Sequence, residues 1–182
     1  AIIVAHYRKK AQKIACVSRA SSSGPDPWFI LHRSLQTGTL LLTVVGWSPA
    51  RMEALNGRLW DTGKLDDLEM YHQIRKVEPL DRALAQLEVS CWASGVRRGQ
   101  TDHRRSMTLL DPIRERLSLR PLLDWTQKDV YYYMQANNLP QHPLFEQGYS
   151  TVGDWHSSAP DGAELSGRNT RFGGLKQECG IH

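Results

Sequence analysis

Apolar and polar positions along the chain change their spacing several times, and each change marks a predicted element. A continuous apolar run between two glycines, residues 38–46, is typical of a buried strand. Ser48 is a suitable helix N-cap and Pro49 suits the first helical position, which predicts a helix over about 49–60. The regular pattern therefore begins near residue 48.

Further along, the spacings of helices and strands alternate. The predicted helices cover about 65–78 and 80–87, and the predicted strands cover 89–93 and 117–123. Pro79 is expected to separate the two helices, since proline ends or breaks a helix. Thr126 and Asp129 have the spacing of a capping box, which predicts a helix to about Asn137. Helices that alternate with short strands indicate a layered α/β fold.

The two ends of the sequence have a different texture. Residues 21–27 combine serines, a glycine and two prolines, which is typical of a loop, and we treat 1–47 as an atypical N-terminal segment. Glycine and proline recur throughout 139–182, which predicts a long loop and a mobile C-terminal tail from about residue 160. The main domain is therefore expected to span 48–182.

Composition excludes several classes of protein. The 182 residues, 40% hydrophobic and 23% charged, suit one globular domain. No apolar run approaches the ~20 residues of a membrane helix, and the apolar stretch near the N-terminus is too short for a signal peptide. Cys16, Cys91 and Cys179 lie far apart and form neither a disulfide framework nor a metal-binding pair. We expect a cytoplasmic protein without a bound metal or membrane contact.

The net charge of +4 is concentrated in one segment. Residues 97–120 contain seven arginines against three acidic residues, so this segment carries the whole surplus. The planar guanidinium group of arginine suits bidentate contacts with phosphate or sulfate. The alternatives are a solvated basic face and a nucleic-acid surface. We disfavour the second because no RNP-like, zinc-finger or helix-turn-helix pattern accompanies the arginines.

Cys179 is the cysteine with the most distinctive surroundings. Its neighbours are polar residues and a glycine, so it is not expected in the core, whereas Cys91 lies in an apolar strand and is expected to be packing. Cys179 is either an accidental exposed thiol or a nucleophile on a flexible arm. Lys176 and His182 would stabilise its thiolate, and Glu178 would oppose this. Together with the arginine-rich segment, such a thiol suits attack on an anionic sulfuryl or phosphoryl compound.

Several blocks of the sequence resemble the phosphoadenylyl sulfate reductases of assimilatory sulfate reduction. The blocks are 48–55, 57–60, 76–80, 82–84, 92–100, 121–125, 142–144, 148–156 and 170–182. The last block ends in Glu178-Cys179-Gly180-Ile181-His182, which is similar to the Glu-Cys-Gly-Leu-His ending of this family. The resemblance implies an adenine-nucleotide α-hydrolase-like, or Rossmann-like, layered sheet with helices.

The resemblance also implies a reaction. The tail cysteine, here Cys179, attacks the sulfur of 3′-phosphoadenylyl sulfate, adenosine 3′,5′-bisphosphate leaves, and an S-sulfocysteine remains. A thioredoxin or glutaredoxin thiol then releases sulfite. The chain would act in sulfate assimilation and cysteine biosynthesis, as a possible homodimer. The nucleotide- and sulfate-binding positions implied by the resemblance are Lys76, Arg97, Arg98 and Arg171, to which we add Lys176 and His182 from the tail.

Two features separate this sequence from its wider family. Related reductases that carry a four-iron cluster, and typically use adenylyl sulfate, have cysteines near the block after Gly153. Here 154–158 has none, which favours a cluster-free enzyme with the 3′-phosphorylated substrate. The family's serine- and glycine-rich phosphate loop and its Leu-Asp-Thr block are not found before Ser48. A degenerate, non-catalytic relative is therefore the alternative interpretation.

Overall fold

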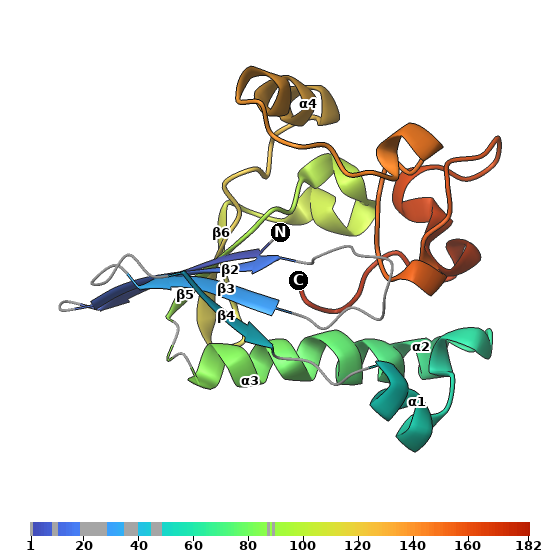
Figure 1. Ribbon diagram of the computed structural model, residues 1–182, viewed down its shortest axis with the longest axis horizontal. Coiled ribbons are helices and arrows are strands. Elements are labelled where there is room, and N and C mark those ends of the chain that lie inside the picture. The colour runs from blue at the N-terminus through green and yellow to red at the C-terminus, as the bar shows by residue number, and fades with distance from the viewer. Residues whose placement is uncertain are drawn as a thin grey trace.

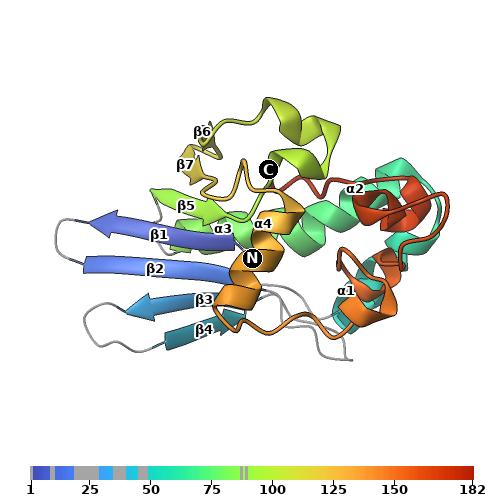
Figure 2. The ribbon, with the colours of Figure 1, turned by 90° about the horizontal axis from the view of Figure 1, so that it is seen from above.

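The computed structural model describes the backbone of residues 2–8, 11–18, 29–34, 40–44, 49–86, 88 and 90–182, with side chains from residue 50 onward except 87, 89 and 155. Its centre is a mixed sheet with helices on both sides (Figure 1). The first three helices lie along one face of the sheet, and the fourth lies on the other (Figures 1 and 2). The C-terminal segment lies beyond one end of the strands. The expected layered α/β fold is confirmed.

The sheet has the order β4-β3-β2-β1-β5-β7-β6. Its strands are β1 (Ile2–Arg8), β2 (Ala11–Ser18), β3 (Phe29–Ser34), β4 (Leu40–Val44), β5 (Cys91–Ser94), β6 (Leu110–Ile113) and β7 (Arg116–Leu119). The first four strands form an antiparallel meander, and β1 joins it to β5, also antiparallel. Strands β5 and β7 are parallel, which is the pairing typical of a layered α/β domain.

One strand prediction needs adjustment, and its hairpin partner was missed. Strand β7 ends at Leu119 rather than near 123, because Pro121 has no N–H to donate and the chain turns, with Leu123 N–H donating to the Arg120 carbonyl. Strand β6 was not predicted. It pairs with β7 as an antiparallel hairpin whose turn contains two residues with positive φ, Arg114 and Glu115, without the usual glycine signal.

The helical layer differs from the prediction at one point. Helix α1 (Pro49–Asn56) is followed by a 3₁₀ turn, and α2 (Leu65–His72) continues through a π-helical turn into α3 (Glu78–Gln86). The prediction that Pro79 separates two helices is wrong. The Glu78 N–H donates to the Gln73 carbonyl five residues back. The wider π-helical turn lets the helix continue through Pro79, although proline has no N–H to donate.

Two apolar clusters hold the helices and loops in place. One joins Met52, Leu59 and Tyr71 between α1 and α2, and the other joins Val96, Met107 and Leu123 beneath the arginine-rich loop. Each such buried side chain contributes about 1.5–3 kcal/mol relative to an exposed one. The second cluster fixes the loop that follows β5, and so fixes the arginines on it.

Helix α4 (Gln127–Ala136) begins as predicted. The Thr126 hydroxyl accepts from Asp129 N–H, and the Asp129 carboxylate accepts from Thr126 N–H. The rest of the chain is irregular, with 3₁₀ turns at Phe145–Gln147, Trp155–Ser157 and Gly167–Gly174. None of the helices in the described ranges has the length and apolarity that crossing a bilayer requires. The last residues are packed, with Ile181 only 3% exposed, so mobility of the tail stays a prediction.

Candidate active site

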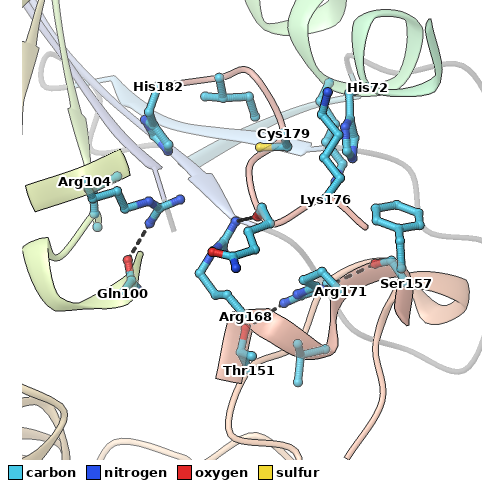
Figure 3. Close-up of a pocket in the computed structure, with 18 residues that line it drawn as sticks. His72, Gln100, Arg104, Thr151, Ser157, Arg168, Arg171, Lys176, Cys179 and His182 are labelled. Atoms are coloured by element: carbon cyan, nitrogen blue, oxygen red, sulfur yellow. Dashed lines mark hydrogen bonds between the residues drawn. The ribbon is translucent and has the colours of Figure 1, made fainter. Parts of the chain in front are cut away.

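A cavity of about 300 Å³ lies where the C-terminal tail meets the π-helical turn, the loop after β5 and the 3₁₀ turn at 167–174. The Cys179 thiol lines it, between His182 on one side and His72 and Lys176 on the other (Figure 3). Five cationic side chains share the lining: Lys76, Arg104, Arg168, Arg171 and Lys176. A nucleophilic atom among several cations suits an anionic substrate.

The predicted site residues divide between two cavities. Lys76, Arg171, Lys176, Cys179 and His182 all line the first. The two other predicted residues, Arg97 and Arg98, line a second cavity of about 630 Å³. Trp125 and the start of α4 line this cavity as well. The two cavities share Gln100, Thr151 and Arg168, so they are neighbours rather than separate sites.

Arg98 organises the loop on which several of these arginines lie. Its guanidinium donates to the carbonyls of Arg105 (2.8 Å) and Met107 (2.7 Å) and to Asp124 (2.9 Å). These contacts leave it little freedom to bind a ligand. Burial lowers the pKa of Arg97, and the nearby Arg104 adds to this, so Arg97 lies in an electropositive and partly dehydrated place.

Arg171 is held in a cradle of hydroxyl groups. Arg171 is 6% exposed, and its guanidinium donates to Thr151 Oγ1 (2.7 Å) and Ser158 Oγ (3.1 Å). Gly153 makes room for it, since a Cβ at this position would lie 1.2 Å from Arg171 Nη1. The glycine of the 148–156 block therefore leaves the space that the arginine of the 170–182 block occupies.

Lys76 and Asp154 form a buried ion pair on the wall of the cavity. Their side chains are 10% and 4% exposed, and Nζ lies 2.9 Å from Oδ2. His72 packs nearby on the same helical run. Burial lowers the pKa of His72 to about 3, and the Lys76 charge adds to the effect, so the imidazole is neutral near neutral pH.

The tail is fixed mainly through Glu178. Arg104 Nε and Nη2 donate to its two carboxylate oxygens at 2.8 and 2.7 Å, and Thr101 Oγ1 donates at 2.7 Å. Arg168 donates to the Gln177 carbonyl and lies 3.5 Å from Glu178 Oε2. Although burial opposes its ionisation, the hydrogen bonds from Arg104 and Thr101 hold the pKa of Glu178 below its usual value.

Three further contacts hold the end of the tail. Arg114 Nη2 donates to the Gly180 carbonyl at 2.6 Å, Ile181 is buried, and His182 stacks on Trp92 with ring centroids 5.6 Å apart. Burial lowers the pKa of His182 to about 3, with Arg104 adding to the shift. His182 is therefore uncharged near neutral pH and would not supply the positive charge that the sequence suggested.

Sequence reasoning missed two residues of the site, Arg104 and Arg168. Arg104 lies within the arginine-rich segment, but nothing local distinguishes it from Arg105, which pairs with Asp102 on the surface. Arg168 precedes the predicted Arg171 by three residues, on the other side of a kink that begins at Arg171, and this closeness in the sequence is the signal that was available. Within the described ranges, no group of three or more histidine, cysteine or acidic side chains is placed to hold a metal ion.

The fold and site together define an α/β domain with a thiol in an arginine-lined pocket, and comparisons identify its family. Residues 35–160 match the family model of the phosphoadenosine phosphosulfate reductase domain. The chain belongs to that family.

Named relatives agree with this assignment. A Synechococcus phosphoadenosine 5′-phosphosulfate reductase is 58% identical over 136 residues, which cover 74% of this chain and 59% of that protein. The Synechocystis enzyme of the same name is 53% identical over 136 residues, covering 74% of this chain and 55% of that protein. The chain thus spans somewhat more than half the length of the curated relatives it matches.

A solved structure confirms the fold. The crystal structure of phosphoadenylyl-sulfate reductase from Candida auris, a phosphate complex, superposes with a TM-score of 0.51 at 28% identity. The match covers 62% of this chain and 53% of that one. The division of the sequence at residue 47 remains a prediction, as do the individual roles of the site residues.

Proposed function

We propose that this chain reduces 3′-phosphoadenylyl sulfate to sulfite and adenosine 3′,5′-bisphosphate, with Cys179 as the nucleophile. The observation that carries the proposal is the Cys179 thiol lining a cavity together with five cationic side chains. The relatives named above, which share up to 58% identity with this chain, bear the name of this activity. The C. auris structure similar to this one is a phosphate complex, which fits a pocket for oxyanions.

The first step is transfer of the sulfuryl group to the enzyme. The Cys179 thiolate donates an electron pair to the sulfur of the substrate and forms an S–S bond. The bond between that sulfur and the bridging oxygen breaks, and adenosine 3′,5′-bisphosphate leaves with its electron pair. Arg168, Arg171 and Lys176 are the cations placed to offset the negative charge that grows on the leaving group. The enzyme is left as S-sulfocysteine.

The second step returns the cysteine and releases sulfite. A thiolate of thioredoxin or glutaredoxin attacks Sγ of Cys179, sulfite leaves with the electron pair of the S–S bond, and a mixed disulfide forms. The second thiol of the reductant resolves this disulfide and restores the Cys179 thiolate. The two electrons come from the dithiol, so the reaction requires no iron–sulfur cluster. The tail has to move to present Cys179 to a protein partner.

The two cavities divide the substrate between them in this proposal. The sulfuryl group lies beside Cys179 in the first, where Lys76, Arg171 and Lys176 surround it. The nucleotide extends toward the second, which Arg97 and Arg98 line. Such an enzyme would work in the cytoplasm in sulfate assimilation and cysteine biosynthesis, and a homodimer is part of the proposal. The proposal includes neither a nucleic acid nor a membrane as a partner.

The competing interpretation is a non-catalytic relative. Its basis is that residues 1–47 do not resemble the family's phosphate-loop sequence. The serine- and glycine-containing stretch at 21–24 lies outside the described residues. The described strands β1–β4 form an antiparallel meander, whereas a phosphate loop normally joins a strand to a helix N-terminus.

A single-turnover experiment separates the two. The protein is reduced, freed of reductant and mixed with 3′-phosphoadenylyl sulfate, and its Cys179 peptide is examined by mass spectrometry. The proposal expects the mass increment of one SO₃ group on Cys179 and its removal by reduced thioredoxin. Cys91→Ser is the matched control and should still form the adduct, whereas Cys179→Ser should not. A folded protein that forms no adduct would support the non-catalytic interpretation.

A further inference from the structure

Asp154 contacts a cation of the cavity wall without being part of that wall. The Lys76 side chain lines the cavity of Cys179, whereas Asp154 is not among the described residues that line it. Lys76 Nζ lies 2.9 Å from Asp154 Oδ2, and the two side chains are only 10% and 4% exposed. In a pair so well shielded from water, each charge depends strongly on the other. Asp154 therefore acts on the cavity through the Lys76 ammonium group.

The position of Asp154 is itself fixed by a short turn, residues 153–158. The Asp154 carbonyl accepts a hydrogen bond from Ser157 N–H at 2.9 Å and from the hydroxyls of Ser157 and Ser158, both at 3.0 Å. Ser158 Oγ also accepts from Gly153 N–H at 2.7 Å. Because the backbone is held at both ends of the turn, the Asp154 carboxylate has a defined place, and a cation paired with it has a defined place too.

Lys76 needs such a fixed partner. Its ammonium group ends a flexible four-carbon stem, which by itself adopts many rotamers. Like charges repel, and four further cations line the same cavity: Arg104, Arg168, Arg171 and Lys176. Among the described residues, Asp154 is the ion-pair partner of Lys76, and the Tyr71 ring centroid lies 6.0 Å from Nζ. Without the charge of Asp154, the other cations would repel the ammonium group from its place on the wall.

We propose that Asp154 is a positioning residue, which fixes the Lys76 ammonium group where it donates hydrogen bonds to the sulfuryl group of the bound substrate. This assignment rests on the proposed function, because it concerns the step in which Cys179 attacks that group. An ammonium group has three N–H donors. One is directed to Asp154, so two remain for the oxygens of the sulfuryl group. No bond to Asp154 forms or breaks in the reaction.

A fixed Lys76 matters more for the rate of sulfuryl transfer than for substrate binding. The remaining cations of the cavity still attract an anionic substrate when Lys76 is displaced. Transfer, however, requires the sulfur to lie in line between the Cys179 thiolate and the leaving oxygen, and a misplacement of about 1 Å can lower a rate about a hundredfold. Loss of the Asp154 charge is therefore expected to lower the limiting rate of transfer, with little change in the half-saturating substrate concentration.

The first measurement tests the position of Lys76 without any turnover. A trace amount of acetic anhydride acetylates lysine amines, and the rate at each lysine is followed by mass spectrometry of its peptide. Exposed Lys128 is the internal reference. In the unsubstituted protein, Lys76 should react at least about tenfold more slowly than Lys128, because burial and a charge-assisted hydrogen bond protect its amine.

Asp154→Asn keeps the size of the side chain and removes its charge. It should raise the acetylation rate of Lys76 several-fold relative to that of Lys128. The matched control is Glu69→Gln, the same change from acid to amide at the partner of another lysine of the cavity, Lys176. Because Glu69 is 67% exposed, its ion pair is weak, and the control should leave the acetylation of Lys76 unchanged.

The second measurement follows formation of the SO₃ adduct on Cys179 in a single turnover, over a range of substrate concentrations. Asp154→Asn should lower the limiting rate at least about tenfold and change the half-saturating concentration by less than about threefold. In a Lys76→Met background, which lacks the ammonium group, Asp154→Asn should lower the rate no further. A merely structural role of Asp154 would lower the rate in both backgrounds.

Either measurement can overturn the proposal. Acetylation of Lys76 as fast as that of Lys128 in the unsubstituted protein would show that the ammonium group is not held, and this result depends on no variant. For an Asp154→Asn protein that circular dichroism shows to be folded, unchanged acetylation of Lys76, or an equal loss of rate with and without the Lys76 ammonium group, would also overturn it. Absence of the SO₃ adduct in the unsubstituted protein would instead refute the proposed function, and acetylation reports the position of Lys76 independently of that result.

Discussion

Gly153→Ala tests the packing of the candidate site with a single methyl group. The backbone of Gly153 lies outside the positive-φ region, so alanine suits its conformation, and the cost falls mainly on Arg171, with a lesser contact at Ser157 Oγ, 2.9 Å from the new Cβ. The new Cβ would lie 1.2 Å from Arg171 Nη1 and 2.4 Å from Cζ, so the guanidinium has to leave its cradle. It then loses its hydrogen bonds to Thr151 and Ser158. Hydrogen bonds to a charged group contribute about 1.5–3 kcal/mol each, so we expect a destabilisation of about 3–6 kcal/mol for the two.

Denaturant unfolding measures this change, and a double-mutant cycle isolates its cause. In an Arg171→Ala background the clash with the guanidinium is gone and the 2.9 Å approach to Ser157 Oγ remains, so Gly153→Ala should cost much less than in the natural sequence. Gly99→Ala is the matched control, because no heavy atom lies within 4 Å of its Cβ, and it should change stability by less than about 0.5 kcal/mol. An equal loss for Gly153→Ala with and without the Arg171 side chain would refute the reasoning.

Three other predictions follow from single contacts. Lys76→Met removes the ammonium group that pairs with the buried Asp154 carboxylate and should cost about 3 kcal/mol in denaturant unfolding, where a change below about 1 kcal/mol would contradict it. Burial lowers the pKa values of His72 and His182 to about 3, so both histidines bind protons more weakly in the folded protein than in the unfolded chain. Their contribution to the free energy of unfolding is therefore complete above about pH 6.5 and declines as the pH falls toward 3, by up to about 1.4 kcal/mol per pH unit for each histidine. Equal unfolding midpoints at about pH 7 and pH 5 would contradict this prediction. Thr126→Ala removes the N-cap of α4 and should cost about 1 kcal/mol, measured by the same unfolding assay.

Local elements were predictable where a few neighbouring residues decide them. The capping box at Thr126 and Asp129 predicted the start of α4, because each group bonds a partner three residues away. The same local reasoning failed at Pro79, where a π-helical turn carries the helix through. A proline forbids one hydrogen bond, and only the packing around it decides whether the helix ends or widens.

The candidate site shows the same division. The sequence pointed to a tail thiol, Cys179, and to basic partners, of which Lys76, Arg171 and Lys176 line the cavity with it. It also pointed to Arg97 and Arg98, which lie in the neighbouring cavity instead. The order of the sequence blocks along the chain identifies the family, but it does not indicate which arginine lines which cavity.

By itself, the sequence determined the α/β class, the start of α4 and the family to which the chain belongs. Only the tertiary structure decided that Arg104 holds Glu178, a residue 74 positions away. It also decided that Gly153 makes room for Arg171 and that His182 is neutral. The physical reason is range: capping, propensity and periodicity act over a few residues, whereas burial and the pairing of charges depend on where the whole chain brings distant side chains.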